Sequence, residues 1–484
     1  MFSWQWEDFQ EIITSYAPAV DNHGPLAGPI RRFSIRRDPD LQLCMDTEGP
    51  ESVDQRDMRH PPGTVRINED RVTFRSDMGL ELEAIGVSAA HTNTHIEGSA
   101  PGVTTQKVDI HRLVGKFALS RTPRYTIDWL ENVPTVFLWP DNIERNIEEI
   151  TIVTLGGVPP TRPKLVMSGR SSPTGSSWAA AQLEVNGIHL YLCEAQRVDA
   201  INVKKPGYIV YDGVPADEFR DRVRRCLSFA LGSYLIYLGA SRFDQEWSLT
   251  DFEVVSPYTM HGRAIELPPM PPSPLGTRSF WDIDTLKLSR MVNAIYTRYD
   301  DLNFGVVSWA YWHAVTAAPH IAAVHFGAAL ESLQRAYFSS TEVPRSSKIL
   351  DDETWRKVLT SLESALDNSD LASDIREPFR NKIRNLNSRS QHSTGKDLVD
   401  ELELVLSKRE KEAHDARHES AHGKDSEVDV EWIRDLKLLR IRFHRIFVTM
   451  TGANNEYYDY FTIGNPVRRL KEPVPDSVQW NSGT

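Results

Sequence analysis

The chain has 484 residues, which is too long for one compact core and enough for two or three domains. Hydrophobic residues make up 40% of it and charged residues 25%, as in a folded globular protein and unlike a disordered or fibrous one. The 67 acidic and 55 basic side chains give a formal net charge of -12, which excludes a surface that binds any nucleic acid as a polycation. Contact with RNA or DNA is therefore expected to be local.

The cysteine content and the N-terminus indicate the compartment. Cys44, Cys193 and Cys226 are too few and too far apart for a disulfide framework or a C-x-x-C metal site, so we expect a reducing cytoplasm. The N-terminal MFSWQWEDFQEI has acidic residues where an export signal needs basic ones before an apolar run. Export is therefore not expected.

Short segments with alternating apolar residues dominate residues 1–265, as at 65–74, 80–87, 164–169 and 187–198. Turn residues separate them, and β-branched or aromatic residues recur at period two. This pattern predicts an antiparallel β-rich domain, a sandwich or a curled sheet. One helix is expected at about 216–238, and a strand follows it from Asp251.

Two polar motifs in this region were considered as sites. HTNTHIEG places His91 and His95 four residues apart beside Glu97, but the segment is typical of a turn next to strands, so no metal is expected. SGRSSPTGSS at 168–177 superficially looks like a phosphate-binding loop. Five residues instead of four separate Gly169 from Gly175, and serine replaces the lysine, so a surface loop is predicted.

A proline-rich segment at 266–279 marks the clearest domain boundary, because its five prolines stiffen the backbone against regular structure. Downstream, the apolar spacing is helical, and one such face follows Pro319 with Phe326, Leu330, Leu333 and Tyr337. Further helices are expected at about 281–299, 302–318, 352–366, 371–388, 396–416 and 427–450. We predict an α+β protein with a β-rich domain at 1–265, a linker at 266–279, an all-α helical bundle at 280–465 and a tail at 466–484.

Residues 302–330 carry no formal charge and are long enough to cross a bilayer, at about 20 residues per span. The segment also contains Asn303, Pro319 and three histidines. We therefore predict two buried helices broken near Pro319, with membrane disruption by this segment as the alternative.

The polar segment 407–427, SKREKEAHDARHESAHGKDSE, lies between two apolar helices, and its composition alone favours a solvated helix end and loop. Within it, Arg417 and His422 form an R-x-x-x-x-H motif, His418 directly follows the arginine, and Gly423 is a typical helix C-cap. Residues five apart on a helix diverge by about 140°. Arg417 and His422 can therefore face one site only if the helix ends between them, as Gly423 would allow.

These residue types suit cleavage of a phosphodiester without a metal or other cofactor. A neutral histidine can take the proton of a ribose 2′-hydroxyl and return one to the leaving oxygen. A guanidinium offers permanent, planar charge to the phosphate. His414, His418 and His422 also recur every fourth residue, so a zinc-binding stripe is the alternative.

The C-terminal half resembles HEPN domains, and most closely the helical module of ApeA-like anti-phage proteins. The matching segments are AAVHFGAALESLQRAYF (322–338), FRNKIRNLNSR (379–389) and ARHESAHGK (416–424). Arg417, His418 and His422 match the HEPN signature, an arginine and a polar residue followed by a histidine. The β-rich half resembles the amino-terminal domain of the same family in its architecture and in GASRFDQEW (239–247). Lys424 replaces the tyrosine that toxin-type HEPN proteins often carry, so regulation through that tyrosine is not expected.

The resemblance implies a metal-independent endoribonuclease with Arg417, His422 and His418 as catalytic residues. It implies an RNA substrate and a homodimer or higher homo-oligomer, in which two motifs line one cleft. It further implies a role in bacterial anti-phage defence by abortive infection, with an N-terminal domain that senses a phage-derived trigger or regulates. The alternative is a non-catalytic HEPN module that binds nucleotides or RNA or serves as a scaffold.

Two features of the implied site stay open at this stage. Glu331, in the first HEPN-like helix, could point into the cleft or be solvated. The site itself is nearly neutral, so RNA binding would need a dimer groove that also gathers Arg440, Arg442 or Arg445. Without them, the acidic balance would restrain a nuclease that is potentially toxic to its own cell.

Overall fold

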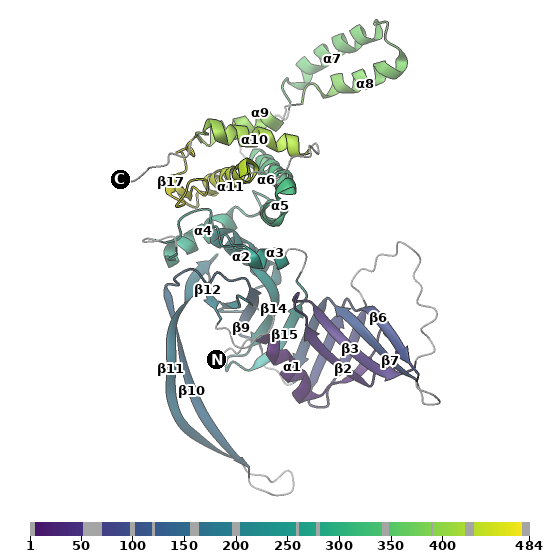
Figure 1. The fold of residues 1–484 in the computed structure, drawn as a ribbon, viewed down its shortest axis with the longest axis vertical. Coiled ribbons are helices and arrows are strands. Elements are labelled where there is room, and N and C mark those ends of the chain that lie inside the picture. The colour runs from purple at the N-terminus through teal and green to yellow at the C-terminus, as the bar shows by residue number, and fades with distance from the viewer. Residues whose placement is uncertain are drawn as a thin grey trace. The chain divides into compact units, whose positions relative to one another are not determined.

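The computed structural model describes residues 5–51, 70–96, 102–118, 122–154, 164–195, 204–257, 261–276, 281–340, 348–388, 391–421 and 430–476. The chain forms two compact units, Met1–Pro271 with Leu275–Asn293, and Pro272–Pro274 with Ala294–Thr484. Strands dominate the first unit and helices the second (Figure 1), which confirms the predicted α+β class. The boundary between the units passes through helix α4 (Thr285–Thr297), downstream of the proline-rich segment.

The described strands of the first unit form two antiparallel sheets (Figure 1). The larger has the order β1-β4-β5-β8-β15-β14-β9-β13-β12-β11-β10 and the smaller β2-β3-β7-β6. The strands of the larger sheet are β1 (Ala19–Asn22), β4 (Arg71–Arg75), β5 (Leu80–Ile85), β8 (Arg112–Phe117), β9 (Tyr125–Glu131), β10 (Asp141–Thr154), β11 (Lys164–Val185), β12 (Ile188–Glu194), β13 (Gly207–Tyr211), β14 (Ile236–Phe243) and β15 (Leu249–Val255). Those of the smaller sheet are β2 (Arg32–Arg37), β3 (Leu43–Pro50), β6 (Ser88–His95) and β7 (Val103–Ile110).

Side chains of both sheets share one hydrophobic core. Met45 and Val108 of the smaller sheet and Phe74 and Val254 of the larger one are buried in it, together with Phe9 of helix α1 (Gln5–Tyr16). Every second residue of β7 is buried, as the alternating sequence predicts. Each large apolar side chain in such a core contributes about 1.5–3 kcal/mol, so the shared core holds the two sheets together.

Helix α2 (Asp217–Leu231) ends earlier than predicted. Gly232 adopts the left-handed conformation at φ 64° and its N–H donates to the carbonyl oxygens of Phe229 and Ser228, which caps the helix. The expected continuation to residue 238 is wrong, because 236–243 forms β14 and pairs with β9 and β15. Once the glycine has ended the helix, the aromatic and β-branched residues that come after it form a strand, which is the structure that these residue types favour.

Two expectations about loops in the first unit are also wrong. The segment 168–177 lies within β11 and pairs with β10, for example Ser168 with Ile150 and Gly175 with Arg145, so it is not a surface loop. The partner strand supplies backbone hydrogen bonds that override the turn-forming composition. His91 and His95 lie in strand β6 rather than in a turn, and both are exposed.

The described helices of the second unit are α5 (Phe304–Thr316), α6 (Pro319–Ser340), α7 (Asp352–Asp367), α8 (Ser373–Asn385), α9 (Gln391–Glu401), α10 (Lys408–Ala421) and α11 (Val430–Thr451). A small hairpin of β16 (Glu456–Tyr458) and β17 (Val467–Arg469) follows them, and a short helix α3 (His261–Glu266) belongs to the first unit. Helices α5 and α6 confirm the predicted pair broken near Pro319. Among the residues that the structure describes, no helix has the length and apolarity needed to cross a membrane.

Helix α10 packs against α6 and α11, which also pack on each other. Leu439, Phe443, Ile446 and Met450 of α11 are buried, as predicted for its inner face. The predicted helix at 396–416 is wrong, because α9 ends at Glu401 and α10 begins at Lys408. The residues assigned to a tail also belong partly to this unit, since β17 lies among them and the side chain of Val474 is fully buried.

Candidate functional site

Helix α10 carries two of the three predicted catalytic residues. Arg417 and His418 lie in its last turns, and the described helix ends at Ala421. The side chains of Arg417 and His418 lie outside the described part of the chain, and His422 lies wholly outside it. The structure shows how α10, the helix that leads to the motif, is held against its neighbours.

The N-terminal half of α10 is anchored by a buried ion pair. Glu410 and Arg445 of α11 are paired, and both side chains have no exposed surface. Oε2 of Glu410 also accepts the N–H groups of Ser407 at 2.9 Å and Val474 at 3.2 Å. The Arg445 guanidinium donates further hydrogen bonds to the carbonyl oxygens of Leu470 and Val405. The buried charges are thus paired and hydrogen-bonded, which is the condition under which burial is tolerated.

A second set of ion pairs ties the start of α10 to the start of α11. Nη2 of Arg409 lies 2.7 Å from Glu431 and 2.8 Å from Asp435. The backbone N–H of Arg409 donates to Asp476 at 2.9 Å. Because Arg409 is only about a quarter exposed, these contacts fix the start of the helix more firmly than a surface pair would.

The spacing of residues along α10 shows which face of the helix position 417 is on. Position 417 follows Glu410 by seven residues, which is two turns with a drift of only about 20°. Position 417 is therefore on the same face of α10 as Glu410 and His414, and His414 is buried at 5% exposure. Glu410 and His414 belong to the part of α10 that packs in the helical unit, where α10 contacts α6 and α11.

The arginines of α11 do not form the basic groove that RNA binding was expected to need. Arg445 is fully buried and Arg442 is 5% exposed. Arg440 is half-buried, and its Nε donates to the Tyr311 hydroxyl at 3.1 Å. Arg442 and Arg445 therefore do not contribute to such a groove in the structure described, because the packing of α11 turns both guanidiniums into the interior.

Beneath Arg440 lies a buried polar cluster. The Tyr311 hydroxyl and Nε2 of His444 are 2.8 Å apart, and His444 has no exposed surface. Burial, and then the charge of Arg440, lower the pKa of His444 well below its usual value, and burial raises the pKa of Tyr311. Both groups are therefore held neutral, and they form a hydrogen-bonded part of the core.

Two further candidate residues lie in the described part of the chain. Glu331 lies in α6 and is half-buried, and His91 lies on the exposed strand β6 of the first unit. In the described ranges, no three histidine, cysteine, aspartate or glutamate side chains lie close enough to hold a metal. The histidine stripe 414-418-422 extends beyond those ranges at His422.

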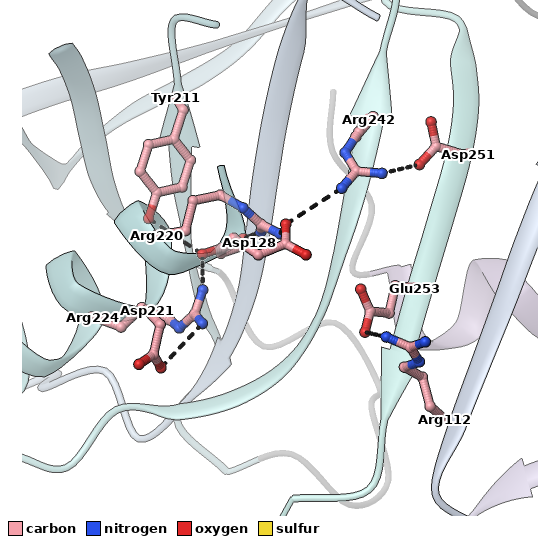
Figure 2. A network of polar contacts seen from close by, with 10 residues as sticks. Arg112, Asp128, Tyr211, Arg220, Asp221, Arg224, Arg242, Asp251 and Glu253 are labelled. Atoms are coloured by element: carbon pink, nitrogen blue, oxygen red, sulfur yellow. Dashed lines mark hydrogen bonds and ion pairs between the residues drawn. The ribbon is translucent and has the colours of Figure 1, made fainter. Parts of the chain in front are cut away.

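A second buried ionic network lies in the first unit, and it was not predicted from the sequence. Asp128 of β9 has no exposed surface, and Arg220 and Arg224 of α2 both donate to it (Figure 2). The Tyr211 hydroxyl donates to the same carboxylate at 3.2 Å. Burial alone would lower the pKa of Arg220 and Arg224, but the charge of Asp128 reverses this and raises both. The signal in the sequence was an aspartate within the apolar strand YTIDWLE.

This network links α2 to the sheet and continues to the surface. Arg220 also pairs with Asp217 at 2.6 Å, and Arg242 of β14 lies 3.5 Å from the same carboxylate. Arg242 pairs in addition with Asp251 at 2.7 Å (Figure 2). The ion pairs of Arg220 and Arg224 with Asp128 thus fix α2 against β9 of the larger sheet. No protein-family model, curated protein or solved structure matched the chain.

Proposed function

We propose that the chain is a metal-independent endoribonuclease of the HEPN class, similar to ApeA-like proteins, that acts in bacterial anti-phage defence. The observation that supports this most is the placement of the motif. Arg417 lies in α10, whose start is anchored, and His422 comes in the sequence between the described part of α10 and the last long helix, α11. The order, a β-rich unit and then a helical unit, is that of the resembled family.

The proposed reaction uses the ribose of the substrate as nucleophile. His422 takes the proton from the 2′-hydroxyl, the 2′-oxygen attacks phosphorus, and the bond from phosphorus to the 5′-oxygen breaks. A proton returned through histidine leaves with the 5′-oxygen. Arg417 holds the phosphate as negative charge builds on its oxygens, and His418 orients or assists. The products are a 2′,3′-cyclic phosphate and a 5′-hydroxyl.

We propose that the working form is a homodimer or a higher homo-oligomer, because one arginine and one histidine make only half of such a site. Arg442 and Arg445 are not available to bind RNA, because both are buried. We therefore expect weak RNA affinity in the resting protein, with a shallow dependence on salt.

The N-terminal unit would act as the sensing or regulatory part, with a phage-derived component as trigger and the cytoplasm as the place of action. This assignment is supported only by the separation of the chain into two units and by the resemblance.

The test is cleavage of RNA by the purified full chain in excess chelator. Wild type is expected to cleave and to leave 2′,3′-cyclic phosphate ends, and His422→Ala and Arg417→Ala are expected to lose at least about a hundredfold in rate. His91→Ala is the control, because this histidine is exposed on β6 of the other unit. Equal cleavage by wild type and His422→Ala contradicts the proposal. RNA binding by the wild type without cleavage favours the non-catalytic module.

A further inference from the structure

A pocket in the first unit lies beside the buried network of Asp128. It has a volume of about 450 Å³ and opens where β5, the start of β8, the start of β14 and the end of β15 meet. Its polar and aromatic lining consists of His111, Arg112, Tyr234, Tyr237, Glu253 and Ser256. A volume of this size is in the range that small-molecule sites occupy, about 300–1,000 Å³.

The buried network fixes one wall of this pocket. Asp128 holds Arg224, and the Arg224 guanidinium lies 4.0 Å from the centre of the Tyr237 ring. A cation over an aromatic face stabilises that arrangement by about 0.5–2 kcal/mol and restricts the ring. A buried ionic network is a costly way to stabilise a fold. Here it also holds an aromatic wall in place before any ligand arrives.

The charges in the pocket are balanced. Arg112 pairs with Glu253 at 3.3 Å, and both are seen beside the network in Figure 2. Burial, and then the charge of Arg112, lower the pKa of His111, which keeps the imidazole neutral near pH 7. Burial raises the pKa of Tyr234 and of Tyr237, so both hydroxyls stay protonated. The pocket therefore has no surplus positive charge with which to hold several phosphates.

The hydrogen-bonding groups are mixed. A neutral imidazole has one donor and one acceptor, a tyrosine hydroxyl can do both, a guanidinium only donates and a carboxylate only accepts. Ile85 and Ile236 add aliphatic surface. A ligand that matches this lining is flat, uncharged and carries donors and acceptors along its edge.

We propose that this pocket binds the base of a nucleoside, with the tyrosine walls contacting the ring and His111 and the Arg112–Glu253 pair contacting its edge. The inference goes beyond ribonuclease activity and does not rest on it. It gives the β-rich unit a ligand class of its own, an uncharged nucleoside and not a nucleoside polyphosphate.

Calorimetric titration of the full chain with adenosine, guanosine, cytidine and uridine tests the proposal. Saturable binding of at least one nucleoside is expected, and His111→Ala should weaken it about tenfold, which corresponds to one hydrogen bond of about 1.4 kcal/mol. Tyr237→Leu, which keeps bulk but removes the ring, should weaken it at least as much. His91→Ala, outside the pocket, should bind as wild type does.

Circular dichroism melts of each variant separate lost binding from lost folding. Three results would overturn the proposal: no saturable binding of any of the four nucleosides to wild type, unchanged affinity in folded His111→Ala and Tyr237→Leu, or binding of adenosine monophosphate more than tenfold tighter than of adenosine. The last result would show surplus positive charge that the lining does not contain. RNA cleavage by the same preparations is scored separately, so the two proposals fail independently.

Discussion

Removing the Glu410 carboxylate would test how α10 is held. In Glu410→Ala, the guanidinium of Arg445 stays fully buried without its charge partner, and the N–H groups of Ser407 and Val474 lose their acceptor. Breaking a buried pair from one side costs about 3–5 kcal/mol. A domain is stable by only about 5–15 kcal/mol, so this loss would raise the unfolding equilibrium constant about a hundredfold to several thousandfold.

Two further variants separate charge from packing. Glu410→Gln keeps the volume and an acceptor for both N–H groups, so we expect a smaller loss of about 1–3 kcal/mol. The double variant Glu410→Leu with Arg445→Met removes both charges and keeps apolar bulk, so it should be more stable than Glu410→Ala. Urea unfolding of the full chain, followed by circular dichroism at the helical signal, measures the free energy of unfolding of the helical unit without adding salt.

The reasoning fails if Glu410→Ala loses less than about 1 kcal/mol, because a charge that is truly buried cannot be left unpaired so cheaply. It also fails if the double variant is less stable than Glu410→Ala. In the proposed enzyme, the same loosening of α10 would lower cleavage without touching the motif, and Glu410→Gln would recover part of it.

Three more changes have definite expected outcomes. Burial at the end of β9 raises the pKa of Glu131 to about 7, and the backbone N–H groups of Lys204 and Lys205 partly oppose this shift. Between about pH 4.5 and 7 the folded state holds a proton that the unfolded state has lost, so the free energy of unfolding falls as the pH rises through this range. Glu131→Gln should therefore raise the free energy of unfolding by about 3 kcal/mol, and with it the melting temperature, at pH 8 but not at pH 4. His444 has a lowered pKa, so stability should fall as pH drops below about 6.5, and unfolding measured between pH 7 and 5 should show a smaller slope in His444→Gln. Gly232→Ala should destabilise more than Gly187→Ala in thermal melts, because both glycines have positive φ but only the Cβ at 232 would clash with the backbone of Met270. Equal losses would contradict the clash.

The fold class and most helices followed from periodicity, because their residues pack in ways that local spacing encodes. The helix after Pro319 and the inner face of α11 are examples. The errors occurred where partners distant in sequence decide the structure. Residues 168–177 have the composition of a loop, but they form a strand because β10 pairs with them. Residues 236–238 continue a helical pattern in the sequence, but Gly232 ends the helix before them and they pair with β9.

The site shows a different limit of sequence reasoning. A motif such as Arg417 with His422 can be found from residue types, but whether neighbouring cations help it depends on which way a helix faces. Arg440, Arg442 and Arg445 looked equivalent in the sequence, yet one contacts a tyrosine hydroxyl, one is nearly enclosed, and one is paired with Glu410 in the core. Because Arg442 and Arg445 are buried in the fold, their positive charges are not available to RNA. If the proposed nuclease is active, most of its affinity for RNA must come from the shape of the assembled cleft or from a change brought about by its trigger.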